Sequence, residues 1–223
     1  MHRVVAAAFC AALLFTGRAA SADSIAVGDT VHVLNSGGTI YGGVFYVDDL
    51  NVPGPIDLAS FCIQIPQDIN TTDLFNVGDI SLFADDDSGP DPLDDRTAWI
   101  YEQFRGGFLG AYTENEIQAA IWVLEDEWTF ADANAWFPAL APGLVTNATT
   151  LITAAQAAVA GGFVNHNVRI VNLFFPDGSK AQDMLMLVPG TTTQSEAPEP
   201  ATLLLVGSAG AALIRRRVKS RNS

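Results

Sequence analysis

The sequence predicts an α+β fold: an antiparallel β-sheet or sandwich with a central group of about three α-helices. Three observations predict it. Short apolar and β-branched runs broken by Gly, Pro and Asn fill the first part of the chain, helical patterns follow, and two more strand patterns come last. Strands, then helices, then strands indicate an antiparallel sheet with its helices gathered on one side.

The predicted strands are short and are separated by turn-forming residues. They are Val31–Leu34, Thr39–Val47, Ser60–Ile65, Asp79–Phe83, Asn167–Phe175 and Gln182–Val188. Pro176, Asp177 and Gly178 predict a turn between the last two, because proline presets the backbone and glycine accepts the conformations that turns need.

An acidic segment, residues 85–95, separates the first strands from the helices. Its glycine and prolines are expected to exclude regular structure. Crowded carboxylates are ligands that Ca²⁺ accepts, but Gly89 stands where an EF-hand loop needs a third ligand. We therefore expect a solvated loop with calcium as the alternative, and we predict no other metal and no cofactor.

Three helices are predicted. The first is capped by Asp94 or Asp95 and ends at Gly106. The second begins with Thr113 and Glu116 in the pattern of a capping box, and Ile117, Ala120, Ile121, Leu124 and Trp128 recur after it at the spacing of a buried stripe. The third is Ala148–Ala160, with Asn147 as its cap and glycine after its end.

Composition limits the classes of function. The chain has 223 residues, 49% hydrophobic and 16% charged, which is typical of one globular domain. The formal charge is −14, and most of the eleven basic residues lie in the terminal segments, so the body is more acidic still. Such a surface repels phosphate backbones, and we expect no nucleic-acid partner.

The N-terminal residues predict a signal peptide, residues 1–22. Arg3 precedes an apolar run over residues 4–15, and Ala20, Ser21 and Ala22 offer a small-residue cleavage site. We expect cleavage after Ala22 and loss of Cys10 with the peptide. The exported domain is then residues 23–190, joined by a linker at residues 191–197 to a C-terminal segment, residues 198–223.

That C-terminal segment has three parts. Pro198, Glu199 and Pro200 precede an apolar stretch, residues 201–214, and a basic cluster follows, formed by Arg215, Arg216 and Arg217. Basic residues remain on the cytoplasmic side, which leaves the domain outside. As a helix the stretch rises only about 21 Å against a hydrocarbon core of about 30 Å, which suits a temporary transmembrane anchor.

The Pro-Glu-Pro motif, short apolar helix and arginine cluster closely resemble the PEP-CTERM sorting signal of Gram-negative bacteria that make extracellular polysaccharide. The resemblance implies transient insertion in the inner membrane, processing by an exosortase near Pro198–Pro200, and a final place at the cell surface or in an extracellular biofilm matrix. An ordinary C-terminal anchor is the alternative; it would not require Glu199 between two prolines.

After signal-peptide cleavage Cys62 is the remaining cysteine, so no internal disulfide can form. Phe61 and Cys62 in an apolar strand, followed later by Gln118, Ala119, Ala120, Ile121 and Trp122 on a helix, resemble the Cys-Gln thioester domains of bacterial surface proteins. The resemblance implies that Cys62 is the thiol donor and Gln118 the acyl donor of an internal thioester that reacts with a surface amine. Ile117 and Gln64 depart from the family, which commonly has Thr and an acidic residue there.

Alternatives remain for this cysteine and for the protein as a whole. Cys62 is otherwise an inert core residue, and a cysteine hydrolase is disfavoured because His32 and His166 lie in no recognisable motif. We expect no enzymatic turnover. The rival function is a structural or polysaccharide-binding matrix protein, since exposed aromatic side chains bind sugars. The candidate aromatic residues are Trp99, Trp122, Trp128, Trp136 and Phe137.

Overall fold

The computed structural model of the protein describes residues 25–35, 38–40, 42–52, 58–65, 67, 69–86 and 89–188. All of them fall in the first of two units of the chain, Met1–Pro189; the second unit is Gly190–Ser223. The predicted signal peptide, the linker and the sorting segment with its anchor lie outside the described residues. Within the described part, no helix is long and apolar enough to cross a membrane.

The main sheet has six antiparallel strands in the order β3-β2-β1-β4-β7-β8. Their bounds are β1 Thr30–Asn35, β2 Phe45–Asp49, β3 Leu58–Ser60, β4 Leu74–Ser81, β7 Val168–Phe174 and β8 Met184–Leu187. The central strands bury alternate residues, as in β2, where Phe45, Val47 and Asp49 face the interior. The predicted antiparallel sheet and the α+β class are confirmed.

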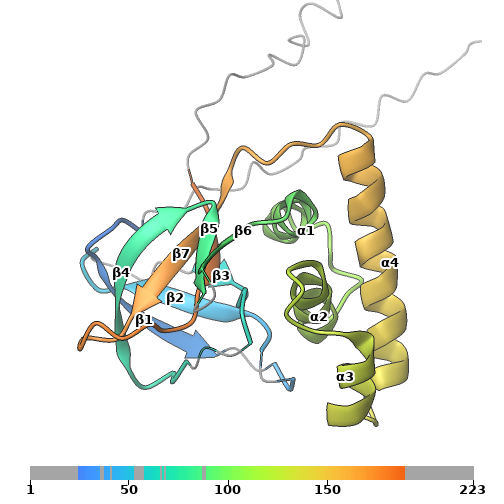
Figure 1. Ribbon diagram of the computed structural model, residues 1–223, viewed down its shortest axis with the longest axis horizontal. Helices are drawn as coiled ribbons and strands as arrows, with labels where there is room; N and C mark the ends of the chain where they lie inside the picture. The colour runs from blue at the N-terminus through green and yellow to red at the C-terminus, as the bar shows by residue number, and fades with distance from the viewer. Residues whose placement is uncertain are drawn as a thin grey trace, which may run out of the picture. The chain divides into compact units, whose positions relative to one another are not determined.

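The two edges of this sheet meet, so the strands wrap into a closed, barrel-like layer (Figure 1). Cys62, just after β3, forms a bridge with Met184 at the start of β8. On either side of that bridge, the Ile63 N–H donates to the Asp183 carbonyl at 3.0 Å and the Leu185 N–H donates to the Phe61 carbonyl at 3.2 Å. Closure places Cys62 at the seam of the barrel, the line along which the end of β3 meets β8. The Ile63 N–H and the Phe61 carbonyl on either side of Cys62 are hydrogen-bonded across this seam.

The strand predicted at Thr39–Val47 is wrong over its first half. Of this range and the residues just after it, only Phe45–Asp49 is strand, and the described residues before it, 39–40 and 42–44, form a loop. Gly43 has φ +133°, a conformation that β-branched residues avoid. A methyl group on Gly42 would lie 2.8 Å from the Gln118 Cγ, so the loop is shaped by the helix packed against it.

The acidic segment is also more regular than predicted. β5 Phe83–Asp86 and β6 Gly89–Pro92 pair as an antiparallel hairpin. Gly89, at φ +125°, is the first residue of β6 and pairs with Asp86. Both prolines lie in β6, which pairs on one side only, where a missing N–H costs little. In the described part of the chain, no group of three or more Asp, Glu, His or Cys side chains is arranged to hold a metal ion.

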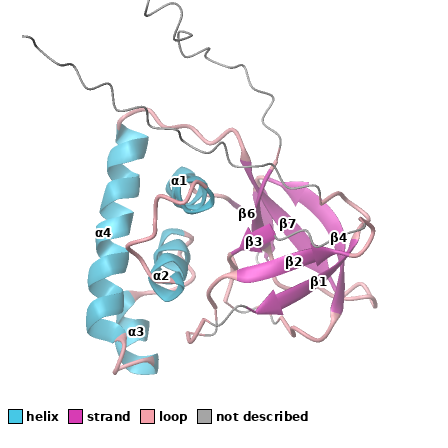
Figure 2. Ribbon diagram, turned by 180° about the vertical axis from the view of Figure 1, so that it is seen from behind, coloured by secondary structure: helices cyan, strands magenta, loops and turns pink. Residues whose placement is uncertain are grey.

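In the part of the chain that the structure describes, four helices occupy one side of the barrel, where three were predicted. They are α1 Asp95–Arg105, α2 Glu114–Leu124, α3 Phe130–Trp136 and α4 Ala141–Ala160. α1 and α2 lie between the barrel and the long α4, which forms the outer layer (Figures 1 and 2). α2 therefore has the barrel on one face and α4 on the other, which explains why nearly all its side chains are buried.

The predicted helix starts are partly right. Asp94 caps α1, and the Thr113 and Glu116 capping box begins α2. α3, with its own capping box of Thr129 and Asp132, was not predicted. α4 begins at Ala141 rather than Ala148, because Pro142 is well placed in a first helical turn. Asn147 is therefore no cap.

Candidate functional site

Cys62 is buried at the seam of the barrel. Its side chain is only 2% exposed, and Phe61 and Ile63 on either side are fully buried. Burial raises the pKa of the Cys62 thiol well above its usual range, because a thiolate would lose its hydration there. The sulfur is therefore a neutral thiol at physiological pH, and any reaction must also move its proton.

Gln118 enters the same region from α2. The Thr113 N–H donates to the Glu116 carboxylate at 2.7 Å, so the start of the helix and its rotation are fixed by the capping box. Asn147 of α4 donates to the other oxygen of Glu116 at 2.6 Å, which ties α4 to the same turn. One turn of this helix brings Gln118 toward the barrel, where its side chain is 0% exposed, deeper than the core edge that the sequence indicated.

The nitrogen and the oxygen of the Gln118 carboxamide both hydrogen-bond to the backbone of Cys62. The amide nitrogen Nε2 donates to the Cys62 carbonyl at 2.8 Å, and the oxygen Oε1 accepts from the Cys62 N–H at 3.2 Å. Oε1 also accepts from the Gly43 N–H at 3.3 Å. The structure thus brings together the two residues that the sequence resemblance selected, although they are 56 positions apart.

Gly42 and Gly43 complete the site, and sequence analysis did not assign them to it. A Cβ on Gly42 would lie 2.7 Å from the Trp122 ring and 2.8 Å from the Gln118 Cγ, so only glycine leaves room for this helix face. Gly43 supplies the second N–H donor to Oε1. The signal that could have revealed them is a pair of glycines inside an otherwise strand-like run.

This arrangement suits acyl chemistry at the Gln118 carbonyl carbon. Two backbone N–H groups on one carbonyl oxygen stabilise the negative charge that develops when a nucleophile attacks the attached carbon. If the Cys62 sulfur attacks, an S–C bond forms and the C–N bond breaks. The thiol proton then leaves with the amide nitrogen as ammonia, so neither an oxidant nor a second substrate is required.

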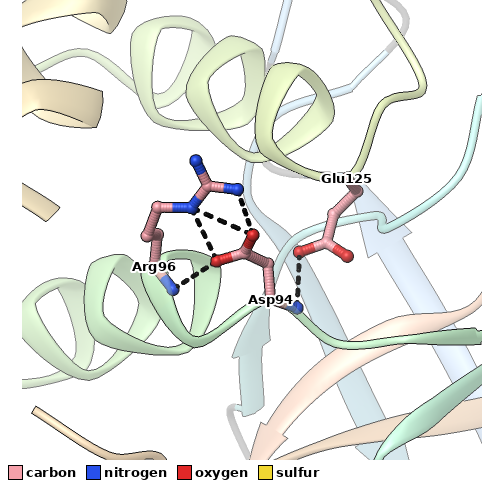
Figure 3. Close-up of polar contacts among 3 residues, drawn as sticks. All are labelled: Asp94, Arg96 and Glu125. Carbon is pink, nitrogen blue, oxygen red and sulfur yellow. Dashed lines mark hydrogen bonds and ion pairs between the residues drawn. The ribbon is translucent and has the colours of Figure 1, made fainter. Parts of the chain in front are cut away.

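A second cluster of ionisable groups joins α1 to α2 (Figure 3). The Asp94 carboxylate accepts from the Arg96 backbone N–H at 2.7 Å and from the Arg96 guanidinium, while the Asp94 N–H donates to the Glu125 carboxylate at 3.3 Å. Burial raises the pKa of Glu125 to about 8. These contacts tie the start of α1 to the end of α2, and so help to hold the helix that carries Gln118.

The other residues selected from the sequence fall elsewhere. His32 Nε2 lies 2.8 Å from the Thr71 carbonyl, so its ring is engaged there. Of the candidate aromatics, Trp122 and Trp128 are buried, Trp99 and Phe137 are partly buried, and Trp136 is half exposed. The predicted sorting residues lie outside the described residues; they are Pro198, Glu199, Pro200, Arg215, Arg216 and Arg217.

Comparison with known proteins gives no relative for this arrangement. No family model, no curated protein and no solved structure matches the chain.

Proposed function

We propose that this chain is an exported bacterial surface protein whose folded domain forms an internal thioester between Cys62 and Gln118. The thioester would then acylate an amine on a partner surface, linking the protein to it covalently. The role is adhesive, and each domain reacts once, so the protein is not an enzyme.

The observation that supports this most directly is the double attachment of the Gln118 carboxamide to the Cys62 backbone. Hydrogen bonds of 2.8 and 3.2 Å fix the amide against the residue that carries the thiol, and Gly43 supplies a further donor to Oε1. Fixed donors on the oxygen lower the barrier to attack on its carbon, because they are already in place when negative charge develops there. Burial of both side chains would also protect the product from water.

The sequence ends support the exported location. The apolar run after Arg3 and the small residues before Ala22 have the order of a signal peptide, and the segment that starts at Pro198 has the order of a PEP-CTERM signal. We propose transient anchoring in the inner membrane through residues 201–214, processing by an exosortase, and final display at the cell surface or in the extracellular matrix.

One rival account uses the same contacts differently. Gln118 would be a structural clamp that pairs the Cys62 backbone, and Cys62 would keep a free, inert thiol. The protein would then be a non-covalent structural or polysaccharide-binding matrix component. The two accounts differ in covalent structure, so mass decides between them.

The test is the intact mass of the folded, unreduced protein before and after exposure to methylamine. The thioester predicts a mass one ammonia below that calculated from the sequence. Methylamine then opens the thioester, adds its own mass to Gln118 and frees one thiol, which a thiol reagent counts after unfolding.

Two variants serve as controls. Cys62→Ser keeps the backbone groups that bind Gln118 but removes the sulfur nucleophile, and Gln118→Ala removes the acyl group. Both should show the full calculated mass and no reaction with methylamine. A full mass and one free thiol in the parent protein would overturn the thioester proposal and favour the clamp.

A further inference from the structure

A cavity of about 490 Å³ lies next to the Cys62 and Gln118 contact and is not part of it. It opens between the segment that follows Cys62, the next turn of α2 and the end of α3. Three glutamines, two tryptophans and two isoleucines line it, and none of these described lining residues is charged. The volume falls within the range of about 300–1,000 Å³ that small-molecule sites occupy.

The residues that line the cavity carry buried polar atoms that have no hydrogen-bond partner among the described residues. Gln64 is only 1% exposed, yet neither its amide nitrogen nor its amide oxygen has a hydrogen-bond partner among the described residues. The Gln67 Oε1 and the Trp122 Nε1 are also buried and have no hydrogen-bond partner among the described residues. A buried amide without partners costs free energy, and these four atoms have almost no surface open to solvent, so a ligand in the cavity to which the side chains turn would recover their hydrogen bonds.

The backbone holds these side chains in place. The Gln67 amide nitrogen donates to the Asp85 carbonyl at 3.0 Å, and Gln182 donates to the Gln64 carbonyl, so the glutamines come from segments fixed to one another. Trp136 closes one side of the cavity and is 49% exposed. Its ring lies 6.1 Å from the buried Trp128 ring, which supports it from behind.

We propose that this cavity binds a neutral, hydroxyl-rich ring, that is, one sugar residue of a polysaccharide. Hydroxyls both donate and accept, so several hydroxyls of one sugar ring can together pair with the Gln64 nitrogen, the two glutamine oxygens and the indole N–H. The apolar face of a sugar ring fits against an exposed indole such as Trp136. An anionic sugar is disfavoured, because the protein carries a formal charge of −14.

The proposal stands apart from the thioester. Gln64 is two residues after Cys62, and Trp122 is one helical turn after Gln118, so a sugar bound here would hold its polymer beside the reactive bond. Binding itself needs no sulfur, and Cys62→Ser should leave it unchanged.

The test is titration of the whole protein with glucose, galactose, mannose and their disaccharides, with glucuronic acid as the anionic comparison. Tryptophan fluorescence and protein NMR shifts report binding. We expect a saturable response to at least one neutral sugar. Trp136→Ala and Gln64→Met should each weaken that response about tenfold, through the lost ring contact and the lost hydrogen bonds.

Phe108→Ala is the matched control, because Phe108 is an exposed aromatic residue that does not line the cavity. It should bind sugar as the parent does. The proposal is overturned if no neutral sugar gives a saturable response, if glucuronic acid binds as well as the neutral sugars, or if binding survives both cavity variants. If the mass measurement shows no thioester but a neutral sugar still binds, only the proposed function is overturned.

Discussion

Two buried glutamines, Gln118 and Gln64, differ in whether the fold supplies hydrogen-bond partners for their carboxamides. The Gln118 carboxamide pairs on both sides with backbone groups of Cys62 and Gly43. The Gln64 carboxamide, equally buried, pairs with no described residue, and Gln64 is one of the residues that line a cavity. Both lie close to the barrel seam, one on α2 and one on the segment after Cys62.

At Gln118 the fold itself supplies the hydrogen-bond partners, whereas at Gln64 we propose that a ligand supplies them. The backbone groups of Cys62 and Gly43 satisfy the Gln118 carboxamide within the fold, so this side chain needs no ligand to complete its hydrogen bonds. The unpaired atoms around Gln64 have no such internal partner, and they gain most from an added molecule.

Loss of the Gln118 side chain should destabilise the fold strongly. In the Cys62→Ser background, where no thioester contributes, Gln118→Ala leaves two backbone N–H groups and one carbonyl buried without partners. Each such group costs about 1–3 kcal/mol, so the free energy of unfolding should fall by at least about 3 kcal/mol. Urea denaturation measures it, and a fall below about 1 kcal/mol would show that these hydrogen bonds matter little.

Asp183 differs from both glutamines, because it is a buried side chain that can ionise. Its Oδ2 accepts from the Asp85 N–H at 2.7 Å, and burial raises its pKa from 3.8 to about 7. Between pH 3.8 and about 7, the folded state keeps the proton on Asp183, whereas the unfolded state loses it. The contribution of Asp183 to stability is therefore full below pH 3.8 and is lost as the pH rises through about 7.

Asp183→Asn keeps the acceptor and removes the titration. Denaturation at about pH 5 and about pH 8 should show a loss of stability in the parent on the order of a few kcal/mol and a smaller loss in the variant. Glu125, whose pKa is about 8, continues the decline in both proteins. Equal slopes in parent and variant would show that Asp183 titrates normally.

A larger side chain next to Gln118 should lower the stability of the fold. Gly42→Ala places a methyl group 2.7 Å from the Trp122 ring and should cost about 1–3 kcal/mol. It should also slow thioester formation, since the Gln118 Cγ must move. Gly110→Ala is the control, because a Cβ there meets nothing within 4 Å. Similar thermal midpoints for the two variants would contradict tight packing at Gly42.

The smallest effect is expected at Gln64. Gln64→Met replaces an unpaired amide with an apolar side chain of similar length, so stability without ligand should stay equal or rise by up to about 1 kcal/mol. The same denaturation series measures it. A loss of more than about 1 kcal/mol would show that the Gln64 amide already has partners within the fold, and the contrast with Gln118 would fail.

Sequence patterns predicted local features better than distant ones. The Thr113 and Glu116 capping box and the buried stripe of α2 follow from residues three or four apart, and both were found. The pairing of Phe61–Ile63 with Asp183–Leu185 joins segments over 120 residues apart with no shared local pattern, so barrel closure could not be predicted. The cavity glutamines are equally scattered.

The errors have local physical causes as well. Residues 39–44 look like a strand because Thr39, Ile40 and Val44 favour β-structure, but α2 requires glycine backbone there. The start of α4 was missed because Pro142 and Gly143 resemble a loop, although proline is favourable in a first helical turn. The contact between Cys62 and Gln118 was found by resemblance to a motif, not by any pattern of periodicity.

The most direct measurement is peptide mapping of the folded, unreduced protein, digested in acid so that a thioester survives. The account predicts that the peptide with Cys62 remains joined to the peptide with Gln118, at a combined mass one ammonia below their sum, and that methylamine separates them. Two separate peptides, one with a free Cys62 thiol and the other with an intact Gln118 amide, would contradict it.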